Sequence, residues 1–381
     1  MFNKRIGIDL GTANCVVWLA GTGVVMNEPT VVATTIDDNR VVAVGNEAKV
    51  MLGRTPGNIM ATRPMKDGVI ADYRLTEAML RYFLDRVAGR NRIFKPEVMV
   101  CVPSGVTQVE RRAVLDATLS AGARVAYLIE EPLAAAIGAK IPIAQASGNM
   151  IVDIGGGSTE SAVISLGGVV VHKSARVAGN KLDDAISQFV KKNYNLIIGE
   201  QMAEMIKIQI GDAVVDPKEK DRKIQGKKES EKKRETVYPI SRNNSSKADI
   251  AGEKKKEEKS QKKENDRQME VRGRDAITGL PRMIELGSWE VTSAIAPILQ
   301  QIITCVKSVL EETPPELAAD IIDKGIVMAG GTSQLKNLDK LMTQMTGVVC
   351  HIADDPLLCV VKGTGIALEN IELYKRSVSR K

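Results

Sequence analysis

The chain has 381 residues, of which 44% are hydrophobic, so it is long enough to form two domains with full cores. Five cysteines lack C-x-x-C spacing, and two histidines lack a partner at metal-ligand spacing. These patterns favour buried thiols in a reducing cytosol over disulfides or a zinc site. No run of about 18 apolar residues and no targeting segment is found, so we expect a soluble, unsecreted protein.

The N-terminal part predicts strands first, and then helices and strands in alternation. Glycine turns separate the first three predicted strands, Arg5–Leu10, Cys15–Leu19 and Gly23–Met26. Apolar residues at helical spacing predict a helix over Leu75–Ala88, and a T-x-x-E capping box at Thr107 predicts a helix that runs to Ala121. The other predicted elements here are the strands Glu97–Val102 and Tyr127–Ile129 and the helix Pro132–Ala139.

The same pattern then begins again. The predicted strands Met150–Asp153, Glu160–Ser165 and Val169–Lys173 repeat the order of strand, glycine turn, strand and strand. This internal duplication predicts two domains of common topology. The elements predicted after it are the helices Asn180–Tyr194, Gly199–Gly211 and Trp289–Glu312, the strand Gly325–Ala329, and the helices Ser333–Met345 and Val361–Tyr374.

Residues 216–270 interrupt the pattern. They contain 18 Lys and Arg against 13 Asp and Glu, so most of the net charge of +6 belongs to them. Few apolar residues and dense charge cannot offset chain entropy, and we expect a disordered or frayed helical insertion. It is interpreted as a solvated linker, with anionic lipid, a partner protein or nucleic acid as alternatives. Tyr238 is the one aromatic residue of the insertion, and aromatic residues are not interleaved with its charges, so no specific nucleic acid is expected.

Three glycine-rich turns carry the candidate chemistry: IGIDLGTAN at 6–14, VDIGGGSTE at 152–160 and GIVMAGGTSQL at 325–335. In the first two, an apolar strand ends in an aspartate, Asp9 or Asp153, and a tight turn follows. Such a turn directs backbone N–H groups into one concavity that holds phosphate oxygens, and the aspartate offers hard oxygen to Mg²⁺ or its waters. One such turn is common in α/β folds without a ligand, whereas a related pair favours two half-domains that face a nucleotide.

Several segments together resemble the MreB family, the bacterial actin homologues of the actin, heat-shock-chaperone and sugar-kinase ATPase superfamily. The segments are the three turns with NEPTVVA at 27–33, RPMKDGVIADY at 63–73, IEEPLAAAIG at 129–138 and TPPELAADII at 313–322. The resemblance covers the chain from about Ile6 to Val214 and from about Ile277 to Ile371.

The resemblance implies an α/β, actin-like ATPase fold, in which two RNase H-like domains, each with a smaller subdomain, surround a nucleotide cleft. By this resemblance residues 1–32, 66–145 and 355–381 form subdomain IA, and residues 33–65 form subdomain IB. Residues 146–181 and 290–354 form subdomain IIA, and residues 182–289, with the insertion, form subdomain IIB.

The resemblance also implies the roles of individual residues, with ATP and Mg²⁺ as cofactors. Asp9 and Asp153 would hold hydrated Mg²⁺. Glu131, Ser158 and Thr159 would be catalytic, with Glu131 polarising the attacking water and the Ser158 hydroxyl helping to position it. The cofactor-binding residues would be Thr12, Ala13, Asn14, Gly155, Gly156, Gly157, Ser158, Gly179, Glu204, Lys207, Ala329, Gly330, Gly331 and Thr332.

Three positions depart from the family pattern. Thr332 replaces a glycine, Ser158 replaces a threonine and Asn180 replaces an aspartate, and together these changes put the rate of hydrolysis in question. Bland alternatives also stay open: Glu131 could cap the helix that follows it, and Glu204 and Lys207 could form a solvated ion pair.

Ile93 and Phe94 form an apolar loop tip with basic neighbours, a combination that suits insertion into an anionic leaflet. Some members of the family bind membranes through this loop, although these two residues could instead pack on their own domain.

The resulting hypothesis is a slow ATPase of the bacterial cytoplasm that forms filaments of paired protofilaments on the inner membrane face. It would direct cell-wall elongation and rod shape together with transmembrane morphogenesis proteins. A plasmid-partitioning actin is the nearest alternative, but it needs no lipid-binding loop. A chaperone-type ATPase would need a substrate-binding β-domain after the last helix, and a sugar kinase would need a carboxylate base in a sugar pocket.

Overall fold

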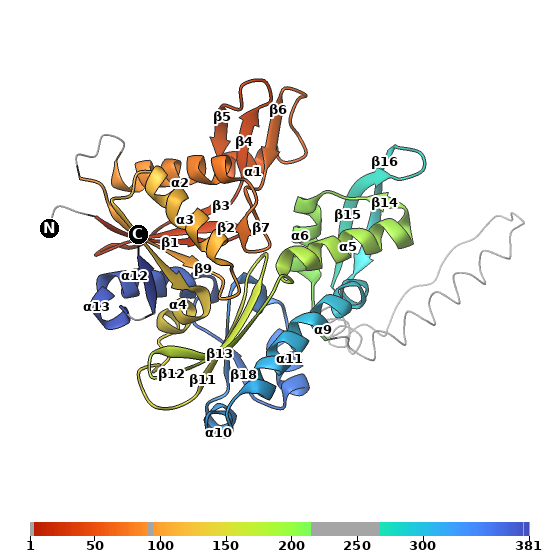
Figure 1. Ribbon diagram of the computed structural model, residues 1–381. Coiled ribbons are helices and arrows are strands. Elements are labelled where there is room, and N and C mark those ends of the chain that lie inside the picture. The colour runs from red at the N-terminus through yellow and green to blue at the C-terminus, as the bar shows by residue number, and fades with distance from the viewer. Residues whose placement is uncertain (1–3, 90–93, 215–266, 376, 381) are drawn as a thin grey trace, which may run out of the picture. The chain divides into compact units, whose positions relative to one another are not determined.

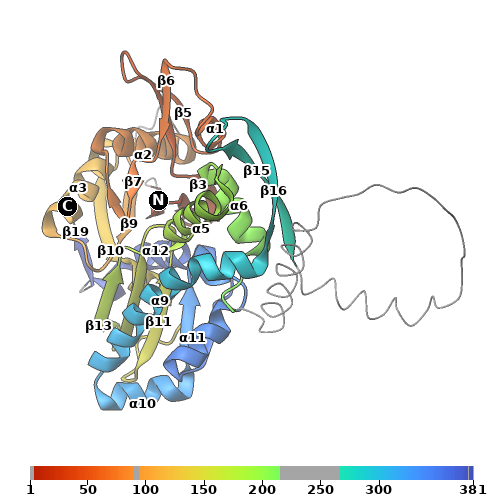
Figure 2. The same cartoon turned by 90° about the vertical axis from the view of Figure 1, so that its right-hand side faces the viewer.

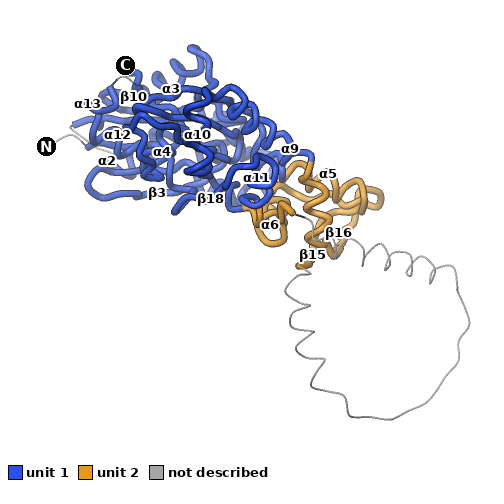
Figure 3. Tube along the Cα trace, turned by 90° about the horizontal axis from the view of Figure 1, so that it is seen from below, with its two compact units in different colours: residues 1–182, 297–334, 338–381 blue, residues 183–296, 335–337 orange. Residues whose placement is uncertain are grey.

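The computed structural model describes residues 4–89, 94–214, 267–375 and 377–380 (Figure 1). The chain forms two compact units (Figure 3). Unit 1 consists of residues 1–182, 297–334 and 338–381, and unit 2 of residues 183–296 and 335–337. The subdomain boundaries expected from the family remain a prediction.

The first large sheet of unit 1 has six strands in the order β19-β10-β9-β1-β2-β3. Its central strands β1, β9 and β10 are parallel, and β2 and β3 continue the sheet as antiparallel hairpins. These strands are, in chain order, Arg5–Leu10, Asn14–Leu19, Gly23–Pro29, Glu97–Val102, Val125–Glu130 and Val378–Arg380. Parallel strands buried on both faces explain the continuous apolar run of β9.

The second large sheet repeats this arrangement with the order β13-β12-β11-β17-β18. Strand β11 pairs with the hairpin β12–β13 on one side and lies parallel to β17 on the other, as β1 does with β2 and β9. The strands are Asn149–Ile154, Thr159–Ser165, Gly168–Ala175, Ile326–Ala329 and Cys350–Ile352. The duplication predicted from the sequence is therefore confirmed.

Helices α4 (Glu131–Gly138) and α12 (Cys359–Glu369) cross very closely in the core of unit 1. A Cβ added to Gly363 would overlap the α4 backbone carbonyl of Ala134, and one added to Gly138 would overlap the carbonyl of Cys359. Small residues allow this approach, and the helices fill the core beside the two sheets.

A small sheet, β5-β4-β6, lies next to α1 and α2 in unit 1 (Figures 1 and 2). Its strands are Val32–Thr35, Val41–Val44 and Ile59–Thr62, and α1 spans Asn46–Met51. The two-stranded sheet β7 (Met65–Lys66) and β8 (Val69–Ile70) leads into α2 (Tyr73–Ala88). The capping box of α3 (Gln108–Ser120) is present as predicted, with Thr107 as the N-cap.

Unit 2 contains the sheet β14-β15-β16, formed by Leu196–Ile197, Gln268–Asp275 and Pro281–Gly287, and the helix α6 (Glu200–Ile210). Helices α5 (Gly179–Tyr194) and α9 (Ser288–Glu312) contribute residues to both units. Asp212 joins several segments of unit 2, because its carboxylate binds Arg267 and Asn337 at 3.2 and 2.8 Å.

Part of the prediction of disorder was wrong. Residues 216–266 of the predicted insertion lie outside the described residues, but residues 268–270 form the start of β15 and pair with β16. Alternation along this strand, with Val271 buried between exposed neighbours, explains why it is ordered despite its charge.

Two predicted helices are shorter than expected. Ser333–Met345 is divided into a 3₁₀ turn, η1 (Gly331–Gln334), and α11 (Leu338–Thr346), because Asn337 takes a left-handed conformation with φ 59°. The closing helix, α12, ends at Glu369 with Asn370 as its C-cap, and the short α13 (Ile371–Tyr374) follows. The helix α10 (Pro315–Lys324) and the 3₁₀ turn η2 (Pro356–Leu358) were not predicted.

Helix α9 is the one described helix that is long and apolar enough, by length and composition, to cross a membrane. Its buried residues recur every three or four positions, which is the pattern of a helix packed in a core. The buried aliphatic residues among them are Val291, Ile295, Leu299, Ile302, Ile303, Val306 and Val309.

Candidate functional site

Four carboxylates gather in unit 1 where β1 and β11 lead into their glycine turns: Asp9, Glu131, Asp153 and Glu160. Burial raises the pKa of Asp153 to about 8, with contributions from Asp9 and Glu160. The pKa of Glu131 lies well above its ordinary range because of burial and of the charges of the other three. The four groups are therefore close enough for their charges to interact, at a considerable electrostatic cost.

The two predicted metal-holding residues fit a cation. Asp153 is 6% exposed, and its Oδ1 is buried without a hydrogen-bond partner. Asp9 accepts a hydrogen bond from the Cys101 thiol at 3.3 Å, and burial raises its pKa to about 6. Among the described residues no group of three or more His, Cys, Asp or Glu could bind a metal directly. The arrangement suits a hydrated Mg²⁺, whose waters would reach the carboxylates.

The first two glycine turns face each other across this cluster. A Cβ added to Gly156 would lie 2.6 Å from the Cβ of Ala13, and one added to Gly157 would overlap the Thr12 side chain. The Thr12 hydroxyl also accepts the Gly68 amide at 2.9 Å. Residues 11–14 and 155–158 are the two segments predicted to bind phosphate, and we call them the first and the second phosphate loop. The Ala13 and Thr12 side chains pack directly on Gly156 and Gly157, so the two loops can approach this closely only because the second loop has glycine at both positions.

The third glycine turn lies beside Asp153. Gly330 has φ 84°, and a Cβ there would stand 2.5 Å from Asp153 Oδ1. Ala329 pairs with Asp153 in the parallel ladder between β11 and β17. The Thr332 hydroxyl donates to the Gly155 carbonyl at 2.7 Å, so this residue links the third turn to the second phosphate loop. Gly331 precedes Thr332 in the chain, and a Cβ added to it would lie 3.1 Å from a methyl carbon of Leu357.

The N-terminus of α5 holds the second phosphate loop from another direction. The amide of Gly179 donates to the Gly155 carbonyl at 3.2 Å, and the amide of Asn180 donates to the Gly156 carbonyl at 2.8 Å. Both contacts use the backbone, so the change from aspartate to Asn180 leaves them in place.

The predicted catalytic residues are placed as follows. Glu131 is the first residue of α4, and the N-cap of that helix is Glu130, which makes no side-chain capping bond. Ser158 lies next to Gly68 at the tip of the second phosphate loop. The Thr159 hydroxyl is fully buried and donates to the Val177 carbonyl at 2.6 Å, so it holds the start of β12.

Two predicted nucleotide-binding residues, Glu204 and Lys207, belong to α6 in unit 2. Lys207 forms an ion pair with Asp183, with Nζ and Oδ2 2.9 Å apart and both side chains mostly buried. Burial raises the pKa of Asp183 to about 6 even though the Lys207 charge lowers it. Lys207 is thus held in place by a partner that the sequence did not indicate.

The predicted membrane loop is described only in part. Ile93 lies outside the described residues. Phe94 is 55% exposed and follows α2, whose C-cap Gly89 has φ 94°. Membrane contact through this loop remains a prediction.

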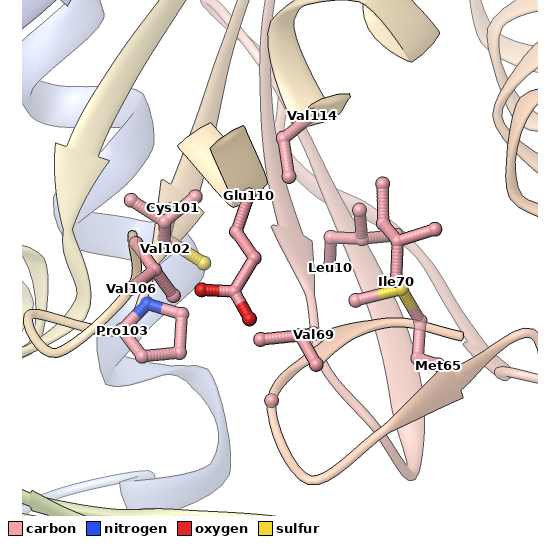
Figure 4. A pocket seen from close by; sticks show the side chains of 11 residues that line it. Leu10, Met65, Val69, Ile70, Cys101, Val102, Pro103, Val106, Glu110 and Val114 are labelled. Carbon is pink, nitrogen blue, oxygen red and sulfur yellow. The ribbon is translucent and has the colours of Figure 1, made fainter. Parts of the chain in front are cut away.

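Two cavities in unit 1 are lined by none of the predicted nucleotide-binding residues. One, of about 10 Å³, is lined mainly by apolar side chains, among them Met65, Val69 and Ile70, with Glu110 as its charged member (Figure 4). It has room for about one water and is far too small for a nucleotide. The other, of about 730 Å³, lies along α2 and β5 and contains none of the predicted site residues.

Glu160 is the member of the acidic cluster that the sequence did not single out. It is 1% exposed, and its carboxylate accepts the Ser104 amide at 3.2 Å and the Ser174 hydroxyl at 2.5 Å. Burial raises its pKa to about 7 despite these two bonds. The signal that could have revealed it is one acidic residue near the start of a strand whose other residues are all uncharged.

Comparison with known proteins identifies the family. The family model described as MreB/Mbl protein matches residues 3–247 and 246–376. The chain belongs to the MreB/Mbl family. It is 45% identical over 379 residues to the cell shape-determining protein MreB of Escherichia coli, and the match covers 98% of this chain and 96% of that protein. It is 42% identical over 379 residues to the cell shape-determining protein Mbl of Bacillus cereus, with 99% and 100% covered.

The structure is also similar to the crystal structure of MreB 5 of Spiroplasma citri bound to AMPPNP. The TM-score is 0.81 at 33% identity, and 99% of each chain is covered. The predicted actin-like fold and the resemblance to MreB are therefore confirmed. Because the relationship spans the whole chain, its role is that of a cell shape-determining protein of the MreB/Mbl family.

Proposed function

We propose that this chain binds ATP with Mg²⁺, hydrolyses it slowly, and uses the nucleotide to control assembly with its own copies into paired protofilaments. The filament lies on the inner face of the cell membrane and directs cell-wall elongation together with transmembrane morphogenesis proteins. One observation carries the nucleotide part: four buried carboxylates, one with an unpartnered oxygen, lie beside two glycine loops that face each other. The AMPPNP bound to the Spiroplasma citri relative supports the same assignment.

The charges in the site favour a cation bound with an anion. Asp9, Asp153, Glu131 and Glu160 repel one another when they are ionised, and a divalent cation would relieve that repulsion. The loops supply N–H donors for the phosphate oxygens of the same ligand. A magnesium triphosphate therefore complements both parts of the site.

For hydrolysis, bound Mg²⁺ would neutralise charge that develops on the phosphate oxygens. Glu131 would accept a hydrogen bond from the attacking water at its carboxylate, and the Ser158 hydroxyl would help to orient that water. Glu131 must be ionised to do so, and its raised pKa opposes ionisation until positive charge enters the cluster. A base that becomes competent only in the loaded site is consistent with slow turnover linked to assembly.

Titration calorimetry with ATP tests the nucleotide part directly. We expect uptake of one nucleotide per chain that depends on Mg²⁺ and is lost in Asp153→Lys, whose ammonium group would occupy the cation's place. Absence of magnesium-dependent uptake by the wild-type chain would contradict the proposal.

Sedimentation with ATP, with and without anionic liposomes, tests the assembly and membrane parts. We expect a pellet that requires ATP and grows when liposomes are present. A chain that never pellets with ATP would be no filament protein, and a pellet indifferent to lipid would match the partitioning class of actin-like filaments.

A further inference from the structure

A threonine hydroxyl lies behind each phosphate loop. Thr30 Oγ1 donates to the Gly11 carbonyl at 2.7 Å, and Thr332 Oγ1 donates to the Gly155 carbonyl at 2.7 Å. Gly11 and Gly155 are the first glycines of the two loops, and each directly follows the last residue of its strand, β1 or β11. The two threonines come from unrelated places in the chain, yet they make the same bond to the same position of a duplicated loop.

Both threonines are well suited to a fixed position. Thr30 is 0% exposed and Thr332 is 8% exposed, so neither hydroxyl has water as an easy alternative partner. At the first loop, the backbone of Thr30 adds a second contact. The Thr30 amide also donates to the Ala13 carbonyl at 2.9 Å.

The direction of each carbonyl fixes the direction of the next amide. In a trans peptide unit the C=O of one residue and the N–H of the following residue point in opposite directions. When Thr30 holds the Gly11 carbonyl on its side, the Thr12 N–H points to the other side. When Thr332 holds the Gly155 carbonyl, the Gly156 N–H is turned in the same manner. Within the described residues, neither of these two amides has a protein acceptor.

We propose that Thr30 and Thr332 are paired positioning residues for the phosphates of a bound nucleotide. Each hydroxyl binds the carbonyl of the first glycine of one phosphate loop and keeps that carbonyl oxygen turned away from the phosphate, which it would repel. The amide of the next residue then faces the phosphate. This inference rests on the proposed nucleotide binding, and it assigns a function to Thr332 at a position where the family has glycine, which has no hydroxyl.

The two loops should not depend equally on their threonines. The Gly155 carbonyl accepts a second hydrogen bond from the Gly179 amide at 3.2 Å. Thr30 is the side chain that holds the Gly11 carbonyl among the described residues. Loss of the hydroxyl should therefore weaken phosphate binding more at Thr30 than at Thr332.

Binding of Mg-ATP and of adenosine to the full chain tests the proposal, with valine and serine variants at each position. Valine keeps the branched shape and removes the donor, and serine keeps the donor. We expect Thr30→Val to raise the dissociation constant for Mg-ATP by about 2- to 12-fold, the range that one net hydrogen bond produces, and Thr332→Val to raise it less. Adenosine, which lacks phosphates, should bind every variant as it binds wild type. Serine should restore the affinity for Mg-ATP.

Thr118→Val is the matched control. Thr118 is 0% exposed and donates to the Val114 carbonyl at 2.7 Å inside α3, so its loss removes an equivalent bond away from the loops. It should lower the melting temperature and leave both affinities unchanged. The inference is overturned if Thr30→Val and Thr332→Val bind Mg-ATP as the control does, if serine fails to restore binding, or if adenosine binding falls by the same factor. Failure of wild type to bind Mg-ATP would instead refute the proposed function.

Discussion

Replacement of Asp153 by asparagine should stabilise the chain when metal and nucleotide are absent. The folded pKa of Asp153 is about 8, against an ordinary value of 3.8. Below pH 3.8 both folded and unfolded states hold the proton, and the group has no effect on stability. Between 3.8 and about 8 the unfolded state loses a proton that the folded state keeps, so stability falls as pH rises; above about 8 the loss is constant.

The magnitude follows from the interval between the two pKa values. At pH 7 the interval from 3.8 is about 3 units, and at 1.36 kcal/mol per unit the cost is about 4 kcal/mol. This is an upper bound, because relaxation and water entry reduce it, and about 2 kcal/mol is a reasonable lower expectation. Asparagine carries no charge, so Asp153→Asn should recover this free energy at neutral pH and recover almost none near pH 4.

Thermal unfolding in EDTA at pH 4 to 8, followed by circular dichroism, measures the effect. Asp153→Asn should melt several degrees higher than wild type at pH 7.5, and the difference should shrink as the pH falls. Asp275→Asn is the control of opposite sign, because hydrogen bonds from Thr278, Ile277 and Arg282 lower the pKa of Asp275 to about 2. A variant at position 153 that is less stable than wild type at pH 7.5, or whose advantage is independent of pH, would refute the reasoning.

Four further outcomes are expected. Gly363→Val should lower the melting temperature strongly, since its side chain would enter the α4 backbone. Gly330→Ala should abolish magnesium-dependent ATP binding in calorimetry, because its Cβ would meet Asp153 at a φ that disfavours alanine. Glu131→Gln should keep ATP binding and slow phosphate release by about 100-fold or more. Phe94→Ser should reduce sedimentation with anionic liposomes and leave ATP binding unchanged, and equal sedimentation would argue against the loop.

Local signals were sufficient for most elements of the two large sheets. β1 and β9 have the bounds that their apolar runs predicted, and the Thr107 capping box gave the start of α3. The duplication predicted the shared topology because each half repeats one strand order around one glycine turn.

The failures occurred where tertiary contacts decide the conformation. The helix predicted over Ser333–Met345 had suitable periodicity, but Asn337 adopts a left-handed conformation that ends any helix, and its side chain is held by Asp212. The strand β15 begins inside a charged segment, and its pairing with β16 supplies order that composition did not indicate. The small sheet β5-β4-β6 has short strands without strong alternation.

The motifs of the candidate site could be predicted from the sequence, but the residues that hold those motifs in place could not. Glycine turns and aspartates could be identified as candidate phosphate and cation positions, because the residue types themselves indicate that chemistry. Glu160, Thr30 and Cys101 act through distant partners, and no spacing in the sequence links Thr30 to Gly11. Such supports become visible only when the fold brings the segments together.

The site contains two kinds of group that require ligand charges of opposite sign: buried carboxylates and loop amides. Its carboxylates are crowded and one carboxylate oxygen has no partner, which destabilises the fold, and the amides of Thr12 and Gly156 have no protein acceptor among the described residues. An isolated cation would satisfy only the carboxylates, and an isolated phosphate only the amides. A ligand that carries both should therefore stabilise the chain far more than either alone, by RT ln(1 + [L]/Kd). Since ionised carboxylates repel most strongly at high pH, that stabilisation should grow as pH rises from 6 to 8.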